Sequence, residues 1–316
     1  MDVSIVVPLY NEEESLPVLE EWINRVMKEH KLSYEIIMVD DGSNDGSWSV
    51  IEALSEKNSL LRGIKFRRNY GKSAALHTGF GAAKGNVVIT MDADLQDSPD
   101  EVPELYRMIV EDGFDVVSGW KKKRYDPFIK RVTSKLYNGT SRLVTGLKLH
   151  DMNCGLKAYK LDVVKSIEIY GEMHRYIPVL AKRAGFGNIG EKVVEHRARE
   201  FGVTKFGWER FINGFLDLMS VTFMTRFGNK PMHFFGIWGS LMFFLGGLVA
   251  SYLIAQKIYY LSFTNLIPRD VTDQPLFYLS LVALVIGVQL FLAGFLGELI
   301  SRSGSDRNLY LIEKEF

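Results

Sequence analysis

Two carboxylates and an amide in one short stretch have the residue types expected of metal ligands. Asp92, Asp94 and Gln96 alternate with Ala93 and Leu95 at the end of an apolar run. Side chains alternate along an extended chain, so Asp92 and Asp94 are expected to point the same way, where they repel unless a cation or a proton joins them. We predict a hard divalent ion, Mg²⁺ or Mn²⁺, held also by Gln96 and by a substrate diphosphate.

Two further polar clusters follow apolar runs in the same manner, and the segments between the runs have helical spacing of their apolar residues. The clusters are Tyr10-Asn11-Glu12 and Asp40-Asp41-Gly42-Ser43, the apolar runs are 4–8, 34–40 and 86–92, and the helical segments are 15–30 and 47–58. Alternating strands and helices predict an α/β fold with a mainly parallel sheet. Ligands of such sheets bind beyond the carboxyl ends of the strands, so the three clusters are expected to share one crevice.

The charge balance hides a strong polarity along the chain. The 316 residues contain 38 Lys and Arg and 38 Asp and Glu, which argues against nucleic acid as a partner. Residues 1–56 hold 13 acidic and 3 basic side chains, whereas 119–150 are strongly basic. The basic stretch is either a solvated face or a surface that meets anionic groups such as lipid headgroups.

The last 88 residues contain only 6 basic and 6 acidic side chains. His233–Ala255 and Leu276–Gly297 are runs of 23 and 22 residues without Asp, Glu, Lys or Arg, and roughly 20 residues span a bilayer as a helix. We predict transmembrane helices at about 233–256 and 276–300; two core helices of a soluble protein are the weaker alternative. An amphipathic segment at 207–228 precedes them and is expected either to pack on the first domain or to lie in the membrane interface.

The beginning of the chain has no basic start and no cleavage site typical of a signal peptide. The first domain is therefore expected on the cytoplasmic side of the membrane, and two spans place both termini there. The basic residues near the spans favour the same orientation, because more of them flank the pair of spans than lie between them. They are Arg226, Lys230, Arg302 and Arg307 on the flanks, against Lys257 and Arg269 between the spans.

Several other chemistries are excluded by motif. The chain has no complete P-loop, no G-x-S-x-G elbow and no H-E-x-x-H helix, so nucleotide hydrolysis by a P-loop, serine hydrolysis and zinc-dependent hydrolysis are not expected. The lone Cys154 excludes an internal disulfide and is expected to be a small buried group. His174 is expected either to touch substrate or to order a loop, and Trp120 either to stack on a ring or to join the core.

Taken together, the ordered motifs resemble those of family 2 glycosyltransferases with the GT-A fold. The later motifs narrow the resemblance to the polyprenyl-phosphate glycosyltransferases, the group of dolichol-phosphate mannose synthase and its bacterial undecaprenyl-phosphate relatives. The motifs are 7–13 (VPLYNEE), 39–47 (VDDGSNDGS), 69–75 (NYGKSAA), 91–97 (MDADLQD), 151–155 (DMNCG), 171–178 (GEMHRYIP) and 199–205 (REFGVTK). The family usually has Ser where this chain has Thr204, which keeps the hydroxyl.

The resemblance implies a GT-A catalytic domain at 1–206, a juxtamembrane helix at 207–228 and a membrane domain at 229–316. It also implies a role for each matching side chain. Nucleotide binding is expected of Pro8, Tyr10, Glu12, Asp40, Asp41, Lys72, Asp92 and Ala93, metal binding of Asp92, Asp94 and Gln96, catalysis of Asp94 and Asp151, and binding of the acceptor phosphate of Lys130, Arg131, Ser134, Lys135, Arg199 and Lys205.

The implied reaction is the inverting, metal-dependent transfer of one sugar from a nucleotide diphosphate sugar to polyprenyl phosphate at the cytoplasmic face of the inner membrane. We expect UDP-glucose as the donor, with GDP-mannose or a modified sugar such as an aminoarabinose derivative as alternatives. A processive polysaccharide synthase is disfavoured because the chain lacks a Gln-x-x-Arg-Trp signature. A non-catalytic membrane scaffold is disfavoured by the intact metal-type residues. The resemblance further implies contact with membrane lipids and a homo-oligomer.

Overall fold

The structure is a computed structural model in which the chain forms two compact units, 1–222 and 223–316, each described here by itself. The described residues are 1–122, 139, 142, 145–197, 219, 223, 227, 230–264 and 269–303. Residues 301–303 are described by their backbone alone. The predicted domain boundaries at 206 and 228 and most of the predicted helix at 207–228 lie outside these residues.

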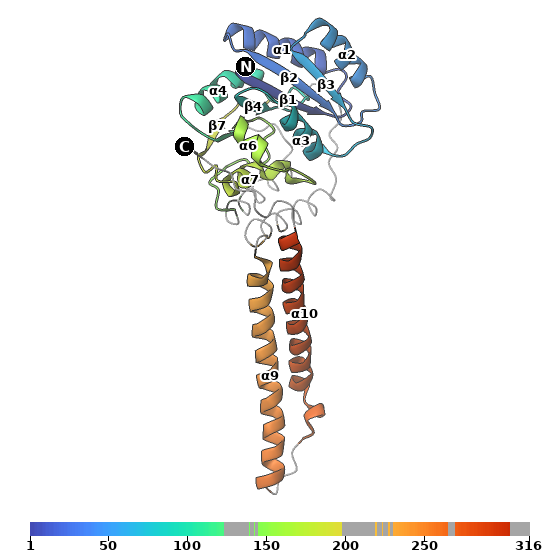
Figure 1. Cartoon of the computed structure of the whole chain (residues 1–316), viewed down its shortest axis with the longest axis vertical. Helices are drawn as coiled ribbons and strands as arrows, with labels where there is room; N and C mark the ends of the chain where they lie inside the picture. The colour runs from blue at the N-terminus through green and yellow to red at the C-terminus, as the bar shows by residue number, and fades with distance from the viewer. Residues whose placement is uncertain are drawn as a thin grey trace. The chain divides into compact units, whose positions relative to one another are not determined.

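Seven strands of the first unit form one sheet among the described residues (Figure 1). They are β1 (Val3–Leu9), β2 (Tyr34–Asp40), β3 (Leu61–Lys65), β4 (Val87–Thr90), β5 (Val116–Trp120), β6 (Lys157–Lys160) and β7 (Ile189–Val193), in the order β3-β2-β1-β4-β6-β5-β7. β1 pairs in parallel with β2 and β4, and β2 with β3. Only β6 among these strands is antiparallel to its neighbours, β4 and β5.

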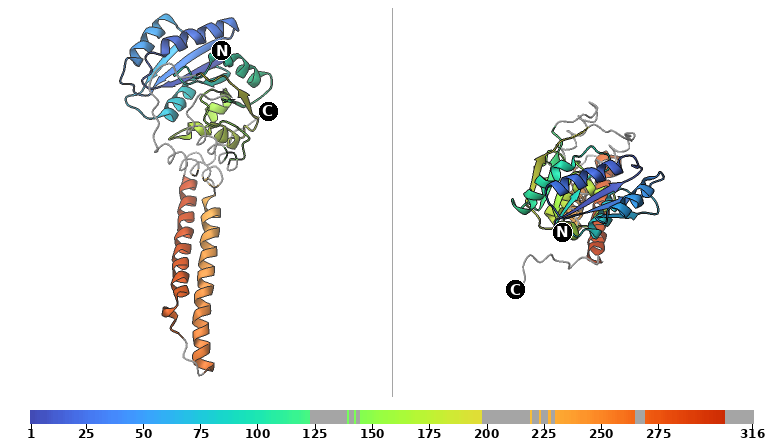
Figure 2. Two further views of the ribbon diagram at one scale, coloured as in Figure 1. Left: turned by 180° about the vertical axis from the view of Figure 1, so that it is seen from behind. Right: turned by 90° about the horizontal axis from the view of Figure 1, so that it is seen from above.

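Helices cover both faces of the sheet, as Figure 2 also shows from behind and from above. One face carries α1 (Leu16–Glu29), α2 (Ser47–Lys57) and α4 (Val102–Val110), and the other carries α3 (Lys72–Ala82), α6 (Leu161–Ser166) and α7 (Ile177–Arg183). Among the described residues, the first unit also contains two short 3₁₀ helices, η1 (Pro99–Glu101) and η2 (Met173–Tyr176), and a third, η3 (Val271–Asp273), belongs to the second unit.

The two-residue period of β1 explains why the sheet needs helices on both sides. Ile5 and Val7 belong to the core under α1, whereas Val6 belongs to the core under α3, and all three are fully buried. A strand that is apolar on both faces cannot be stable with one face in water. The continuous apolar runs at 4–8, 34–40 and 86–92 fit a sheet covered on both sides, and the structure confirms the predicted, mainly parallel sheet.

The predicted elements match the structure closely at the N-terminal end. β1, β2, α1 and α2 lie within about a residue of the expected bounds, whereas β4 ends at Thr90, two residues before the expected end at Asp92. The difference is local, because Ala93 and Asp94 form a turn and Leu95, in the bend that follows, has a positive φ of 58°. The metal-type residues consequently follow the strand instead of ending it.

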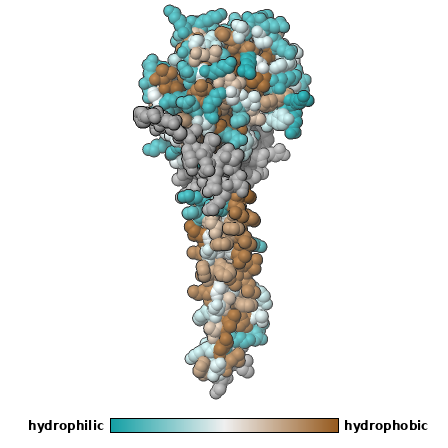
Figure 3. Space-filling view, viewed as in Figure 1, coloured by the Kyte–Doolittle hydropathy of each residue, from teal (hydrophilic) through white to brown (hydrophobic). Residues whose placement is uncertain are grey.

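The second unit is built on two long apolar helices, α9 (Pro231–Phe263) and α10 (Pro275–Ser303). The segments Pro231–Phe263 and Pro275–Ile300 are long and apolar enough to cross a membrane, with hydropathies of 1.8 and 2.4. They contain the predicted spans 233–256 and 276–300. Apolar side chains dominate the surface of both helices (Figure 3).

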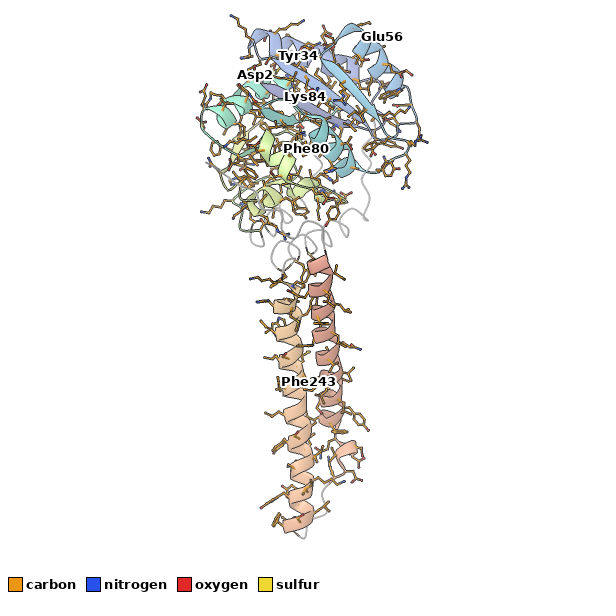
Figure 4. All side chains as sticks on the ribbon, in the orientation of Figure 1. Asp2, Tyr34, Glu56, Phe80, Lys84 and Phe243 are labelled. Atoms are coloured by element: carbon orange, nitrogen blue, oxygen red, sulfur yellow. The ribbon has the colours of Figure 1, made fainter. Side chains whose placement is uncertain are left out.

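Small residues let α9 and α10 pack closely. A Cβ placed on Gly287 would lie 2.7 Å from the carbonyl oxygen of Gly239 and 2.7 Å from the backbone nitrogen of Phe243, a residue labelled in Figure 4. A Cβ on Gly246 would lie 2.7 Å from the carbonyl oxygen of Ser280. In a membrane, where apolar burial gives little driving force, such close backbone contact is a main source of helix association.

We expect Gly287→Ala to destabilise the helix pair by about 1–3 kcal/mol, the usual cost of overpacking. Gly247→Ala is the matched control, because a Cβ there would meet only the tip of Leu284 at 3.8 Å. Both changes gain the same helix propensity, so the difference in thermal unfolding midpoint in detergent measures the contact. Equal midpoints for the two variants would contradict the packing described above.

Candidate active site

The polar clusters lie together at one edge of the sheet. The carboxyl ends of β1, β2 and β4 share this edge because the three strands are parallel. The start of β6 lies there too, since β6 runs antiparallel to β4 and pairs Lys157 with Thr90. The segment 151–155, which precedes β6, is thereby brought to the same edge as Asp92.

The loops that follow β1 and β2 are tied to each other by hydrogen bonds. The backbone N–H of Asn11 donates to Ser43 Oγ at 2.9 Å, and that of Glu12 donates to Ser47 Oγ at 2.9 Å. The amide of Asn44 donates to the hydroxyl of Tyr10 at 3.2 Å. These hydrogen bonds hold the predicted nucleotide-binding residues Tyr10 and Glu12 against the loop that follows β2. Both residues are partly exposed.

Asp40 and Asp41 are buried and mainly organise the neighbouring loops. Asp40 Oδ1 accepts from the backbone N–H of Ser43 at 2.8 Å. Asp41 accepts from the backbone N–H groups of Tyr70 and Gly71 at 2.7 and 2.9 Å. Burial raises the pKa of Asp41, although these two N–H groups oppose the shift. Asp41 thus holds the turn that begins α3, and its predicted contact with the nucleotide stays a prediction, as does that of the buried Pro8.

Lys72 and Asp92 form the central ion pair of this edge. Lys72 is the first residue of α3, and its Nζ donates to Asp92 Oδ1. Desolvation by itself would raise the pKa of Asp92, but the Lys72 ammonium outweighs it and lowers that pKa to about 2. Both side chains remain about one-third exposed. The cation that the paired carboxylates were expected to need is therefore supplied in part by the protein.

Gly155 packs against Asp92 from the other side. A Cβ at this position would lie 2.5 Å from Asp92 Oδ2 and 2.6 Å from Cγ. The carbonyl oxygen of Gly155 also accepts from Thr90 Oγ1 at 2.8 Å, which ties the segment to β4. Only glycine leaves room for the carboxylate of Asp92 at this distance.

Asp94 and Gln96 share with Asp92 a partly exposed position between buried neighbours. Met91, Ala93 and Leu95 are buried in the core, whereas the three polar side chains that alternate with them are partly exposed. Asp94 Oδ1 accepts from the backbone N–H of Gln96 at 3.2 Å. The predicted alternation is confirmed as a pattern of burial.

The segment after Asp94 is anchored to the residues that follow β7. The backbone N–H of Arg197 donates to the carbonyl oxygen of Gln96 at 3.1 Å, and Asp97 forms a bridge with His196. Asp97 is fully buried and pairs with Lys121 at 2.6 Å. Burial alone would lower the pKa of Lys121, but Asp97 reverses this and raises it. Gln96 is therefore held between β4 and the residues that precede 198.

The donors present fit a metal ion that also binds a substrate. No group of three or more His, Cys, Asp and Glu side chains is arranged to hold a metal among the described residues. Mg²⁺ is commonly held by one or two carboxylates together with substrate phosphates. Asp94 and the amide oxygen of Gln96 supply the right kind of ligand, while one oxygen of Asp92 is engaged by Lys72.

In the segment 151–157, the side chains of Asp151 and Lys157 form hydrogen bonds with backbone groups of the same segment. Asp151 is 1% exposed, and its Oδ1 accepts from the backbone N–H of Asn153 at 3.1 Å. Lys157 is also buried, and its Nζ donates to the carbonyl oxygens of Met152 and Cys154 at 3.3 and 2.5 Å. Burial lowers the pKa of Lys157. The predicted catalytic role of Asp151 stays a prediction, since this carboxyl would have to become exposed to reach a sugar.

Cys154 is the small buried group that was expected. It is 2% exposed, and burial raises the pKa of its thiol to about 12. Trp120 stacks on the ring of His150 with the centroids 4.1 Å apart. His150 in turn pairs with Glu191 at 2.7 Å. The ring of Trp120 is thus packed on a side chain of the protein, and a contact of Trp120 with a substrate ring stays a prediction.

His174 joins the site through Ser73. Its backbone N–H donates to Ser73 Oγ at 3.1 Å, and its Nδ1 lies 3.1 Å from the same oxygen. Burial lowers the pKa of His174 well below its ordinary value, and the charges of Lys72 and Arg175 act in the same direction. The imidazole is thus neutral at pH 7 and is fixed beside the residue that forms the ion pair with Asp92.

The predicted acceptor site lies outside the described residues. It comprises Lys130, Arg131, Ser134, Lys135, Arg199 and Lys205. The described segment 145–197 ends two residues before Arg199. The role of these six residues stays a prediction.

A sequence comparison decides the class of protein. Residues 4–168, the segment that contains the Lys72–Asp92 pair and Gly155, match the profile of glycosyl transferase family 2. The chain belongs to this family. The expectation of a family 2 glycosyltransferase with a GT-A-like domain is confirmed, and the protein is an enzyme of this class.

Relatives of this glycosyltransferase align over nearly its whole length. It is 36% identical to the dodecaprenyl-phosphate galacturonate synthase of Rhizobium johnstonii, covering 96% of this chain and 88% of the relative. It is also 36% identical to the undecaprenyl-phosphate 4-deoxy-4-formamido-L-arabinose transferase of Aeromonas hydrophila, covering 96% and 90%. Both relatives are polyprenyl-phosphate glycosyltransferases, which confirms the expected group.

Solved structures support the fold of this glycosyltransferase. Glucosyl-3-phosphoglycerate synthase from Mycobacterium tuberculosis in complex with UDP has a TM-score of 0.55 and 19% identity, covering 71% of this chain and 79% of that one. The same enzyme has been solved with Mn²⁺ and UDP-glucose, at a TM-score of 0.53. At this identity the similarity concerns the fold.

Three residues of the site were not anticipated from the sequence. Gly155 was expected only as part of the motif 151–155, and no role was expected of Ser73 or Lys157. Ser73 follows Lys72 directly, but its partner His174 is 101 residues away, and no spacing rule connects them. The only available signals were local: a glycine within the 151–155 motif and a lysine next to an apolar strand.

We expect Gly155→Ala to lower the turnover of this glycosyltransferase by about 10- to 100-fold, the range seen when groups that orient metal ligands are changed. The added methyl group would displace Asp92 from its position beside Lys72. Gly187→Ala is the control, because a Cβ there meets nothing within 4 Å. Steady-state transfer rates of the two purified variants, with thermal unfolding as a check of folding, make the test. Equal rates would contradict a role for close packing at Asp92.

Proposed function

We propose that the protein transfers a single sugar from a nucleotide diphosphate sugar to polyprenyl phosphate, with inversion at the anomeric carbon. The observation that carries this proposal is the edge of the sheet where Lys72 pairs with Asp92 and where Asp94 and Gln96 are also partly exposed. Such an edge can bind a metal-linked diphosphate. The names of the relatives that align over 96% of the chain support the acceptor.

On the donor side, the protein has to hold the diphosphate and accept the charge that develops on it. Asp94 and Gln96 would hold Mg²⁺ or Mn²⁺, with Asp92 completing the set when Lys72 turns to the diphosphate. When bound, the metal stabilises the negative charge of the departing nucleoside diphosphate. Lys72 would add a second positive charge to the same group, because its ammonium is partly exposed at the start of α3. Tyr10 and Glu12 would line the nucleoside pocket, with Pro8, Asp40, Asp41 and Ala93 behind them.

On the acceptor side, the nucleophile needs no general base. A phosphate monoester has a second pKa near 6, so it is largely a dianion at pH 7. The task of the protein is then to place this dianion in line with the anomeric carbon and to compensate its charge. We assign this task to Lys205 and Arg199 and to the basic segment with Lys130, Arg131, Ser134 and Lys135. Asp151 would bind hydroxyl groups of the sugar.

The identity of the sugar is a separate part of the proposal. The relatives act on a galacturonate and on a formamido-arabinose, by their names. We therefore propose a UDP-linked uronate or modified sugar as the donor, in preference to the UDP-glucose expected from the sequence. Incubation of the purified protein and undecaprenyl phosphate with a panel of UDP- and GDP-sugars, followed by mass analysis of the lipid, identifies the donor.

The location of the enzyme follows from the acceptor and the two apolar helices. Polyprenyl phosphate resides in a membrane, and α9 and α10 are long and apolar enough to cross one. We propose the inner membrane, with the catalytic unit and both termini on the cytoplasmic side, as the distribution of basic residues favours.

We expect Asp94→Asn to reduce the rate of sugar transfer by about 100-fold or more. Mutating a residue that only hydrogen-bonds to a metal ligand already lowers metal affinity or activity by about 10- to 100-fold, and Asp94 is proposed as a ligand itself. Asp100→Asn, which alters an exposed carboxylate six residues further on, is the control. Transfer is measured with increasing Mn²⁺ after removal of bound metal by a chelator. Undiminished transfer by Asp94→Asn at every metal concentration would refute the metal role.

We expect Lys205→Ala to raise the KM for polyprenyl phosphate by about 10-fold or more while the Kd for the nucleotide changes little. The physical reason is the loss of a charge-assisted hydrogen bond to the acceptor phosphate. Initial rates at varied lipid concentration and calorimetric titration with UDP separate the two quantities. Equal losses of lipid and nucleotide binding would argue against the assignment of Lys205 to the acceptor.

A further inference from the structure

A carboxylate of β7 binds the backbone at the beginning of the motif 151–155. Glu191 Oε1 accepts from the backbone N–H groups of His150 and Asp151 at 2.7 and 3.0 Å, and Oε2 lies 2.7 Å from Nδ1 of the His150 ring. The side chain of Glu191 is only 12% exposed, and burial of a carboxylate is costly unless it is hydrogen-bonded. Among the described residues, its hydrogen bonds go to His150 and Asp151 alone.

The register of the sheet places a second contact on Asp151. Glu191 of β7 pairs with Ser118 of β5, so the two side chains lie on the same face of the sheet. Ser118 is fully buried, and its Oγ donates to the carbonyl oxygen of Asp151 at 3.4 Å. The backbone of Asp151 is thus held at its N–H by β7 and at its C=O by β5.

His150 adds a third contact, at the carboxyl end of β5. Its ring stacks on that of Trp120 with an interplanar angle of 14°, a contact that stabilises one orientation of the two rings. Trp120 is the last residue of β5. The carboxyl ends of β5 and β4 share an edge, because β6 is antiparallel to both strands. Residues 150–151 are therefore fixed relative to the edge that contains Lys72 and Asp92.

The contacts from β5 and β7 leave the carboxyl group of Asp151 able to turn. Glu191 and Ser118 bind only the backbone of Asp151, so rotation about its side-chain bonds is still possible. The position of the backbone then determines which points the carboxyl group can reach. In an active site, a displacement of about 1 Å can cost about 100-fold in rate.

We infer that Glu191 is a positioning residue for Asp151, because it fixes the backbone from which the carboxyl group of Asp151 reaches the sugar of the donor. The inference rests on the proposed role of Asp151 in binding that sugar. Glu191 acts through backbone N–H groups, so the inference requires an oxygen that accepts hydrogen bonds and does not require the negative charge. Glu191→Gln keeps such an oxygen, and its amide nitrogen can donate to Nδ1 of a neutral His150.

The first test separates recognition of the sugar from recognition of the nucleotide. The full-length variants are assayed in detergent with undecaprenyl phosphate and the donor that gives a lipid product in the panel of nucleotide sugars. We expect Glu191→Ala to lower kcat/KM for this donor about 10- to 100-fold. The Kd for UDP, which lacks the sugar, is expected to stay unchanged, and Glu191→Gln is expected to retain most of the wild-type kcat/KM.

The control is Glu168→Ala, which removes an exposed carboxylate. If Glu191→Ala does not fold, as judged by thermal unfolding, Glu191→Met takes its place, because Met keeps the length of the side chain without its oxygens. An unchanged kcat/KM in the variant without the oxygens, an equal loss of UDP binding, or a Glu191→Gln variant no better than that one would overturn the inference.

The second test is a double-mutant cycle that combines Glu191→Ala, or its replacement, with Asp151→Asn. If Glu191 acts through Asp151, the kcat/KM of the double variant equals that of Asp151→Asn to within about 2-fold. A double variant whose loss is the product of the two single losses would overturn the inference and leave the proposed function intact. A wild-type kcat/KM in Asp151→Asn would instead contradict the proposed role of Asp151 itself, so the two failures are distinguishable.

Discussion

The arrangement of charged side chains at the carboxyl ends of β1, β2 and β4 depends on the ion pair between Lys72 and Asp92. Parallel strands bring several carboxylates to one side of the sheet, where they would repel each other and lose water on burial. The Lys72 ammonium holds the pKa of Asp92 at about 2, and backbone N–H groups from 70–71 satisfy Asp41. Asp41 helps to place Lys72 beside Asp92, because it binds the two residues that precede Lys72 at the start of α3. Without this compensation, a carboxylate at Asp92 would lower the stability of the domain.

The same pair connects segments that are far apart in the sequence. Asp92 contacts Lys72 on one side and the backbone of Gly155 on the other, and Ser73, the neighbour of Lys72, binds His174. One reversed strand, β6, brings the segment that contains Gly155 to this edge. Three segments far apart in the sequence thus converge at the edge where we propose that the donor binds.

Much of the fold could be predicted because apolar periodicity is a local property. The strands β1 and β2, their helices, and the two long apolar helices follow from runs of residues that are adjacent in the chain. The metal-type residues were also predictable, since their alternation is visible in 91–96. The role of Gly155 and the Ser73–His174 contact were not, because each depends on a partner at least 60 residues away. The spacing of Asp40 and Asp41 likewise did not indicate that both are buried and hold loops.

The sequence alone determined the chemical inventory and its order: carboxylates after strands, a basic middle and an almost uncharged end with two spans. The resemblance of its motifs also determined the family. Only the tertiary structure decided which charges pair, which carboxylates are exposed, and which side of α10 packs on α9. The physical reason is that desolvation and Coulomb interactions depend on distances between segments, whereas periodicity and span length depend on neighbours along the chain.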